Sequence, residues 1–414
     1  MVVLKNLSSQ QLELRNRSRQ FANDVLSQVN PAIKSLHTSR ERFLATAPFY
    51  ESLVKEGFLF NMIPQPFGGG ATSCLDMAVM AEEFYAVDSN VSLTAFASIL
   101  GLSPIFIAGN PQQAEKHLSI FLKKEGKPIA AFASSEPGGS ANVNAPRPAV
   151  GLSTRIDAAK DGWVLNGSKQ WVSSSCGWDN KGADLLCVSG RSELSETHDP
   201  EVSIVILPKE NINIEVEDIF ETVGHTAHIT PRISLHDCHI PKDYLLGNLG
   251  QGKQIIEQAF TATAALVGVF AVGLMRAAFD FTLNYAKSEN KGGLHRILDY
   301  QAVGYALSDA KMQIEAVRGL AYRACIAQDN NEKGAHELAL CSKVYGSETA
   351  VKMITDLMRV VGVDSYNKDL PLSRYLMDAL ALPLFDGGNM GVRRNQYHQI
   401  LMSDSYNSLD TLLE

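Results

Sequence analysis

An aspartate at the end of an apolar run, Asp386, is the residue of this sequence best suited to take a proton from carbon. It precedes Gly387-Gly388, and Arg393 lies seven residues further on. If a helix begins near Asn389, that separation is about two helical turns, which lets the guanidinium face the carboxylate. A carboxylate beside a cation at a junction of loop and helix suits proton abstraction. The alternative is an N-cap aspartate with an arginine on the surface, because Asp is a favoured cap residue.

Two segments could hold a flat, anionic ligand. SSEPGGSAN, residues 134–142, combines two glycines with hydroxyl residues, so its backbone N–H groups could approach a phosphate closely. In KQWVSSS, residues 169–175, Trp171 and Ser173 are two positions apart, which puts both on one face if the segment is a strand. That pairing could lie against an isoalloxazine ring. An ordinary tight turn and a tryptophan in a sheet core are the respective alternatives.

A third segment, KGGLHRILDYQ at residues 291–301, joins the end of one expected helix to the start of the next. Its basic residues Lys291, His295 and Arg296 could meet a pyrophosphate, and a solvated basic loop is the alternative. We expect no metal site, because four histidines crowd the preceding region at spacings that match no common zinc set. These histidines are His225, His228, His236 and His239.

The elements that must position these residues come in three blocks. The pattern indicates helices to about residue 125, strands and turns over 129–245, and helices again from Gly250. In the second block, Asp161-Gly162 and Asn166-Gly167 are dipeptides typical of hairpin turns. In the third block we expect four long helices, over 251–289, 299–328, 334–361 and 390–403. The predicted domains are residues 1–127, 128–248 and 249–414.

Charge and cysteine content limit the partners and the compartment. The net charge of −8 argues against nucleic acid or an anionic membrane as a partner. The six cysteines are scattered and no pair has CxxC spacing, so we expect a reduced, cytoplasmic protein. Residues 258–275 carry no formal charge over eighteen positions, which is near the minimum for a membrane span. Their small and polar residues indicate instead a helix that is buried on most sides.

The order of these segments resembles the acyl-CoA dehydrogenase family over nearly the whole chain. SSEPGGSAN resembles the family's TEPxxGS segment, and DGWVLNGSKQWVSSS resembles DGWxLNGxKxWITNG. HDCHIPKDYLLGNLGQG resembles D-V-x-V-P…LLG…GxG, and LFDGGNMGVRR lies where the family has YEGT…R. The resemblance implies an α+β fold with an N-terminal helical domain, a middle β-barrel-like domain and a C-terminal four-helix bundle.

Two departures from the family pattern narrow the resemblance. The common acyl-CoA dehydrogenases have Glu preceded by Tyr in the last motif, whereas this chain has Asp386 preceded by Phe385. The nitroalkane oxidase branch of the superfamily has the Asp. The segments FDGGNMGVRR, GWDNKGADLLCV and AALVG resemble that branch closely.

The resemblance implies roles for four residues at the reacting carbon. Asp386 would take the α-proton of a nitroalkane, and Arg393 would fix that carboxylate and balance its charge. Thr263 stands where the branch carries a Ser that hydrogen-bonds the catalytic carboxylate. Phe260 would border the substrate channel.

The resemblance also implies FAD as cofactor and a homotetramer as the assembly. Ser173 would hydrogen-bond flavin N5. The remaining residues that would line FAD within one chain are Ser135, Ser140, Trp171 and Asn389. Lys291 and Gln301 would reach the diphosphate and adenosine of FAD bound by a neighbouring subunit, and the small-residue helix at 258–275 could serve the packing of subunits.

The implied reaction converts a nitroalkane and O₂ to an aldehyde or ketone, nitrite and H₂O₂. The main alternative is a flavin-dependent monooxygenase or dehydrogenase of the same fold that acts on an amine or an acyl-CoA-like substrate. Such monooxygenases often lack the carboxylate base, so the pairing of Asp386 with Arg393 favours the oxidase. A non-catalytic scaffold is a further alternative, and it predicts loss of the base or of the flavin-facing residues.

Overall fold

The N-terminal block is helical, as the sequence predicts. The structure is a computed structural model that describes residues 7–142, 145, 149–192 and 201–412. Four of the first six helices begin with a capping box, in which the N-cap side chain and the third helical residue satisfy each other's backbone N–H. The helices are α1 (Ser9–Asp24), α2 (Val29–Ile33), α3 (Ser39–Lys55), α4 (Cys74–Tyr85), α5 (Ser89–Ala108) and α6 (Pro111–Leu122).

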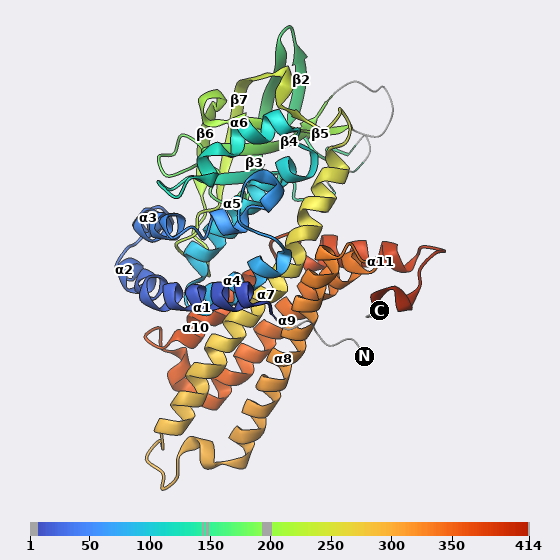
Figure 1. The fold of residues 1–414 in the computed structure, drawn as a ribbon. Helices are drawn as coiled ribbons and strands as arrows, with labels where there is room; N and C mark the ends of the chain where they lie inside the picture. Colours follow the sequence, from blue (N-terminus) through green and yellow to red (C-terminus); the bar gives the residue numbers. More distant parts are fainter. Residues whose placement is uncertain (1–6, 143–144, 146–148, 193–200, 413–414) are drawn as a thin grey trace.

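The middle block is one eight-stranded sheet, which lies at one end of the molecule (Figure 1). The strand order is β6-β7-β3-β2-β4-β5-β8, and β1 pairs with β4 in parallel. Almost every residue of β4 and β5 is buried, so these strands form the centre of the block. The strands are β1 (Ala130–Ala133), β2 (Arg155–Ala159), β3 (Gly162–Gln170), β4 (Leu185–Arg191), β5 (Val202–Pro208), β6 (Ile214–Ile219), β7 (Pro231–Pro241) and β8 (Leu245–Leu246).

One of the two expected hairpin turns is wrong. The chain reverses between Ala159 and Gly162, which are paired across β2 and β3, as the first dipeptide predicts. The second dipeptide, Asn166-Gly167, lies inside β3, where the pairing with β7 shifts register. A Cβ on Gly167 would lie 2.6 Å from the Cα of Thr154. The glycine is therefore required by close packing of the backbone at a bulge and not by a turn.

The C-terminal block is a helical bundle in which α7, α8 and α9 run side by side away from the sheet (Figure 1). The fourth member, α10, packs on α7 and α9, and this short helix is not among the helices that the sequence pattern predicts. The expected helix over 390–403 begins instead with a π-helical turn at Asn389–Arg393. The helices are α7 (Gly252–Ser288), α8 (Gln301–Asp329), α9 (Ala335–Val361), α10 (Pro371–Ala381) and α11 (Arg394–Leu401).

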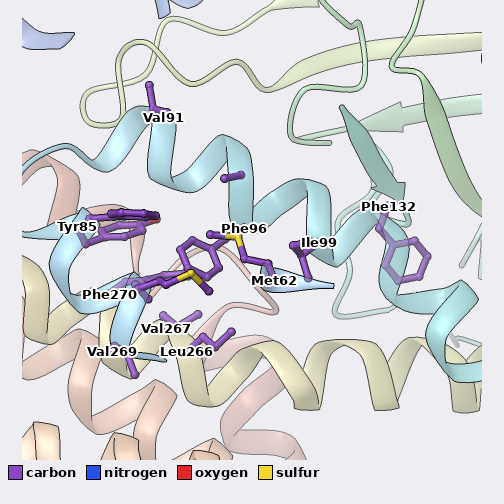
Figure 2. Packing of buried hydrophobic residues seen from close by; sticks show 14 of the residues in the cluster. Met62, Tyr85, Val91, Phe96, Ile99, Phe132, Leu266, Val267, Val269 and Phe270 are labelled. Carbon is purple, nitrogen blue, oxygen red and sulfur yellow. The ribbon is translucent and has the colours of Figure 1, made fainter. Parts of the chain in front are cut away.

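The apolar, small-residue half of α7 packs inside the chain. A Cβ on Gly268 would lie 2.0 Å from Ser342 Oγ of α9, and one on Gly273 would lie 2.7 Å from the Cβ of Tyr85. Figure 2 shows Tyr85 and Phe270 facing each other where α7 passes α5, and their rings stack at 4.2 Å. By length and composition alone α5 and α7 could each cross a membrane, but 72% of the apolar window of each is buried within the fold. These glycines therefore explain close helix packing within one subunit.

The proposed domain limits fall in connecting segments. The limit at 127/128 lies between α6 and β1, and the limit at 248/249 lies between β8 and α7. Both remain predictions.

Candidate active site

The carboxylate of Asp386 receives one hydrogen bond on each oxygen. Thr263 on α7 donates Oγ1 to Oδ1 at 2.8 Å, and Arg393 donates Nη2 to Oδ2 at 2.9 Å. The guanidinium also donates Nε to the Asp386 carbonyl at 2.8 Å and Nη2 to the Phe260 carbonyl at 3.0 Å. The Arg393 side chain is fully buried and that of Asp386 is 5% exposed. This is the geometry that a buried ion pair requires, with further hydrogen bonds on both partners.

The backbone at Asp386 excludes the capping alternative. Asp386 has a φ of 53° and Gly387 a φ of 69°, so the chain turns through the left-handed region after α10. The carboxylate points to Thr263 and Arg393 and not to the first N–H groups of the next helical turn. A Cβ on Gly387 would lie 3.1 Å from the Nε of Arg393, so this glycine also makes room for the guanidinium. Left-handed residues other than glycine are costly and concentrate at functional sites.

The side chain of Asn389 fastens the turn that carries Asp386 to three residues of α9 for which the sequence pattern predicts no role. Asn389 donates Nδ2 to Ser347 Oγ at 3.0 Å and to Glu348 at 3.1 Å. Its Oδ1 accepts from Nζ of Lys343 at 3.2 Å. The amide of Asn389 is thus fully engaged within the chain. Its backbone N–H is also bonded, to the Pro383 carbonyl at 2.9 Å, and the lining of FAD by Asn389 remains a prediction.

Ser173 is held by His228, one of the four histidines whose spacing matches no common zinc set. Ser173 Oγ lies 2.9 Å from Nε2 of His228, whose Nδ1 lies 2.9 Å from Oγ1 of Thr94 on α5. Burial, assisted by the neighbouring His225, lowers the pKa of His228 to about 3, so this imidazole is neutral at physiological pH. The contact fixes the Ser173 hydroxyl between the sheet and the N-terminal helices. Sequence distance hides it, since 55 residues separate the two side chains.

The expectation that Trp171 and Ser173 share one face of a strand is wrong. Strand β3 ends at Gln170, and Trp171 has a φ of 61°, which breaks the alternation of faces. One face of the Trp171 ring stacks on Phe220 with centroids 4.2 Å apart. The residue is 53% exposed, so its ring still offers an apolar surface to a ligand.

Several buried side-chain atoms on the segments that carry Ser173 and His228 have no hydrogen-bond partner. Burying such atoms unpaired is costly, so a polar ligand here would satisfy them. The unpaired atoms lie on the two segments that the Ser173–His228 contact joins: Ser174 Oγ, Ser175 Oγ, Thr222 Oγ1, Thr230 Oγ1 and both ring nitrogens of His225. Together with the exposed ring of Trp171, they fit a ligand that is flat and polar, such as a flavin.

The glycine-rich turn is anchored by a buried ion pair. Lys169 donates Nζ to Glu136 at 2.9 Å and to the carbonyl of Ser134 at 3.2 Å. Glu136 also accepts from the backbone of Ser153 at 2.6 Å and of Thr154 at 3.0 Å. Beyond this anchor the turn faces solvent, with Ser135 half-buried and Ser140 exposed. The arrangement leaves the turn free to contact a phosphate while its base is fixed.

Replacing Glu136 by Ala is expected to lower the free energy of unfolding by about 3–5 kcal/mol, because Lys169 would remain buried without its partner. Urea unfolding at pH 7 measures this loss. As a control, Asp369→Ala removes half of the exposed Lys34–Asp369 pair and should cost no more than about 1 kcal/mol. Equal losses in the two variants would contradict the prediction.

The same anchor gives a pH dependence. Although burial would raise it, Lys169 and the hydrogen bonds from Ser153 and Thr154 lower the pKa of Glu136 from 4.5 to about 2. A depressed carboxyl pKa stabilises the fold above the unfolded value, and this contribution is lost as the pH falls through about 2. The unfolding free energy of the wild type should therefore decrease more steeply below pH 4.5 than that of Glu136→Ala.

Lys291 and Gln301 lie far from Asp386 in the same chain. At 1.5 Å per residue, Ser288 at the end of α7 lies about 38 Å along the helix from Thr263. Lys291 forms an ion pair with Asp364, and Gln301 donates to Tyr305. Neither can therefore contact a ligand that is bound beside Asp386 of its own subunit. No cluster of three or more metal-ligating side chains occurs within the described residues.

Comparisons with known proteins agree with this geometry. The models of the acyl-CoA dehydrogenase N-terminal, middle and C-terminal domains match residues 8–125, 131–238 and 250–402. A nitroalkane oxidase of Podospora anserina is 38% identical, with 97% of each chain covered. A nitroalkane oxidase of Fusarium oxysporum is 35% identical, with 97% of this chain and 95% of that protein covered.

Solved structures give the same relationship. The Podospora anserina nitroalkane oxidase superposes with a TM-score of 0.94 at 37% identity, covering 99% of both chains. An active-site variant of a nitroalkane oxidase, crystallized with 1-nitrooctane, superposes with a TM-score of 0.94 at 34% identity over 98% of both chains.

Proposed function

The chain belongs to the acyl-CoA dehydrogenase family, with the nitroalkane oxidases among its full-length relatives, and on that premise we propose that it oxidises nitroalkanes with FAD. The observation that carries the proposal is the buried Asp386, which Thr263 and Arg393 hold by one hydrogen bond on each oxygen. A related structure is described as that of a flavoprotein nitroalkane oxidase, which supports the cofactor.

Asp386 removes the α-proton of the nitroalkane. A nitro group makes that carbon acidic, because the charge left behind spreads onto the two nitro oxygens. Thr263 and Arg393 orient the carboxylate before substrate arrives, so little reorganisation is needed when the proton moves. The cationic Arg393 also balances the negative charge that is passed from the carboxylate to the substrate. Bound FAD supplies the two-electron oxidation, and O₂ is the final acceptor.

The overall reaction balances with water as a reactant. A primary nitroalkane, O₂ and H₂O give an aldehyde, nitrous acid and H₂O₂, so the C–N bond breaks and oxygen from water enters the carbonyl. The two electrons leave the substrate and reduce O₂ to H₂O₂. A secondary nitroalkane gives a ketone in the same way.

The cofactor would be held by residues from two subunits. Within one chain, Trp171 and Ser173 would contact the ring system, and the turn with Ser135 and Ser140 would contact the phosphates. Lys291 and Gln301, at the far end of α7, would reach FAD of a neighbouring subunit in a homotetramer. The six cysteines are free thiols, which supports a location in the cytoplasm, where thiols stay reduced.

The test mixes the purified yellow protein with nitroethane under air. Nitrite and H₂O₂ should form in equal amounts, together with acetaldehyde. If the flavin stays oxidised under anaerobic conditions even when preformed ethyl nitronate is added, the proposal is wrong. Turnover that requires a separate reductase would point to a monooxygenase instead.

Replacing Thr263 by Val keeps the shape of the side chain and removes the donor to Asp386. A hydrogen bond to a charged group is worth about 1.5–3 kcal/mol, so kcat/KM for neutral nitroethane should fall about 10- to 100-fold. Thr263→Ser keeps the hydroxyl and should remain within about threefold of the wild type. Steady-state oxygen consumption measures all three proteins. A serine variant as poor as the valine variant would show that packing, and not the hydroxyl, matters.

A further inference from the structure

Lys343 is a buried lysine beside the base, and the proposed reaction gives it no role. It lies in the first half of α9 with its side chain fully buried. Its Nζ donates to the carbonyl of Leu382, in a short contact, and to Oδ1 of Asn389 at 3.2 Å. Both acceptors are uncharged oxygens. The side chain is thus placed to fasten backbone and amide groups and not to neutralise a carboxylate by direct contact.

Burying an apolar side chain at this position would cost less free energy than burying a lysine. Burial lowers the pKa of Lys343 from 10.5 to about 7, although Asp386 and Glu348 act in the opposite direction. The nearby Arg393 lowers it further. The sequence therefore keeps an amine where its charged form is disfavoured. This cost indicates that the N–H donors are needed.

The two acceptors of Lys343 lie at the two ends of the turn that carries Asp386. Leu382 directly follows α10, and Asn389 begins the π-helical turn. Between them the chain passes through the left-handed conformations of Asp386 and Gly387. The backbone N–H of Asn389 closes this turn on the Pro383 carbonyl at 2.9 Å, and the two bonds from Lys343 add contacts that hold the closed turn to a neighbouring helix.

Helix α9 is well placed to hold this turn in position. It packs closely on α7, as the contact of Gly268 with Ser342 shows. Helix α7 carries Thr263, which orients the carboxylate. Because Lys343 is adjacent in sequence to Ser342, it ties the Asp386 turn to the same helix pair that supplies the partner of the base.

We propose that Lys343 is a positioning residue, whose ammonium or amine fastens both ends of the 382–389 turn and thereby places Asp386 for proton removal. The inference rests on the proposed function and deepens it. Lys343 then affects the proton-transfer step alone, because it acts only through the turn that carries the base. A substrate that has already lost its proton should not depend on this placement.

Lys343→Met tests the proposal, because methionine has a similar length and no donor. With holoenzyme, kcat/KM for neutral nitroethane should fall about 10- to 100-fold, the loss expected from a misplaced catalytic group. Activity on preformed ethyl nitronate should stay within about threefold, and the Kd for FAD should not change. The primary deuterium isotope effect on kcat/KM with 1,1-dideuteronitroethane should rise. Lys352→Met, at an exposed site on the same helix, should leave all four quantities unchanged.

Hydrogen exchange gives a readout that does not depend on turnover. Peptides that span 382–393 should exchange faster in Lys343→Met than in the wild type and in Lys352→Met. Equal losses on neutral nitroethane and nitronate, or unchanged exchange in the turn, would overturn the proposal. Should Lys343→Met not fold, Lys343→Gln retains one donor group and should show a smaller loss that is again confined to neutral nitroethane. A wild type that fails to oxidise nitronate would sink the proposed function, whereas the exchange measurement would still decide the role of Lys343.

Discussion

Asp386→Asn is expected to lower kcat/KM for neutral nitroethane by about 10³-fold, within the range for loss of a general base, while the protein stays folded and yellow. The amide can still accept from Thr263 and fill the same space, but it cannot take a proton. Asparagine also tolerates the left-handed conformation found at this position, with its φ of 53°, better than most residues. Anaerobic stopped-flow reduction of the flavin measures the step directly.

Preformed ethyl nitronate is the control for this variant. It should reduce the flavin of Asp386→Asn at nearly the wild-type rate, since the proton is already gone. Asp404→Asn, at an exposed aspartate in the C-terminal segment, should match the wild type on both substrates. Loss of nitronate oxidation in Asp386→Asn would mean that the carboxylate does more than accept a proton.

The sequence predicted the parts of this site that lie close together along the chain. Asp386 and Arg393 are seven residues apart, and their pairing follows from a turn and a short helical segment. The contact of Thr263 with Asp386 spans 123 residues, and only the resemblance to a known family suggested it. Local periodicity gives no information about which helix face meets which turn.

Other features required the tertiary structure. His228 follows no motif, yet it holds Ser173 because the loop before β7 folds back over the end of β3. Lys343 lies in an ordinary helical pattern, where a lysine normally indicates a solvent-exposed face. The mistaken strand face at Trp171 and the mistaken turn at Gly167 share one cause. In both places a local backbone preference was outweighed by packing against a distant segment.

Arg393→Met is expected to lower the free energy of unfolding by about 3–5 kcal/mol, because the change leaves Asp386 as a buried charge without its partner. The variant also deprives the carbonyls of Asp386 and Phe260 of a donor. Arg393→Lys keeps the charge, but a single ammonium cannot reproduce the planar set of donors, so it should recover only part of the loss. Urea unfolding of the FAD-loaded protein measures both variants. Arg359→Met, at an exposed site on α9, should cost less than about 1 kcal/mol.

A double-mutant cycle separates the charge of Arg393 from its packing. When Asp386 is already Asn, no buried carboxylate remains to be stranded, so Arg393→Met should then cost less by about 1–3 kcal/mol. Strict additivity of Asp386→Asn and Arg393→Met in unfolding would contradict the ion pair as the reason for the burial of Arg393. A large coupling would instead explain why the chain keeps an arginine in a fully buried position: its charge is needed only because Asp386 must remain a carboxylate away from water.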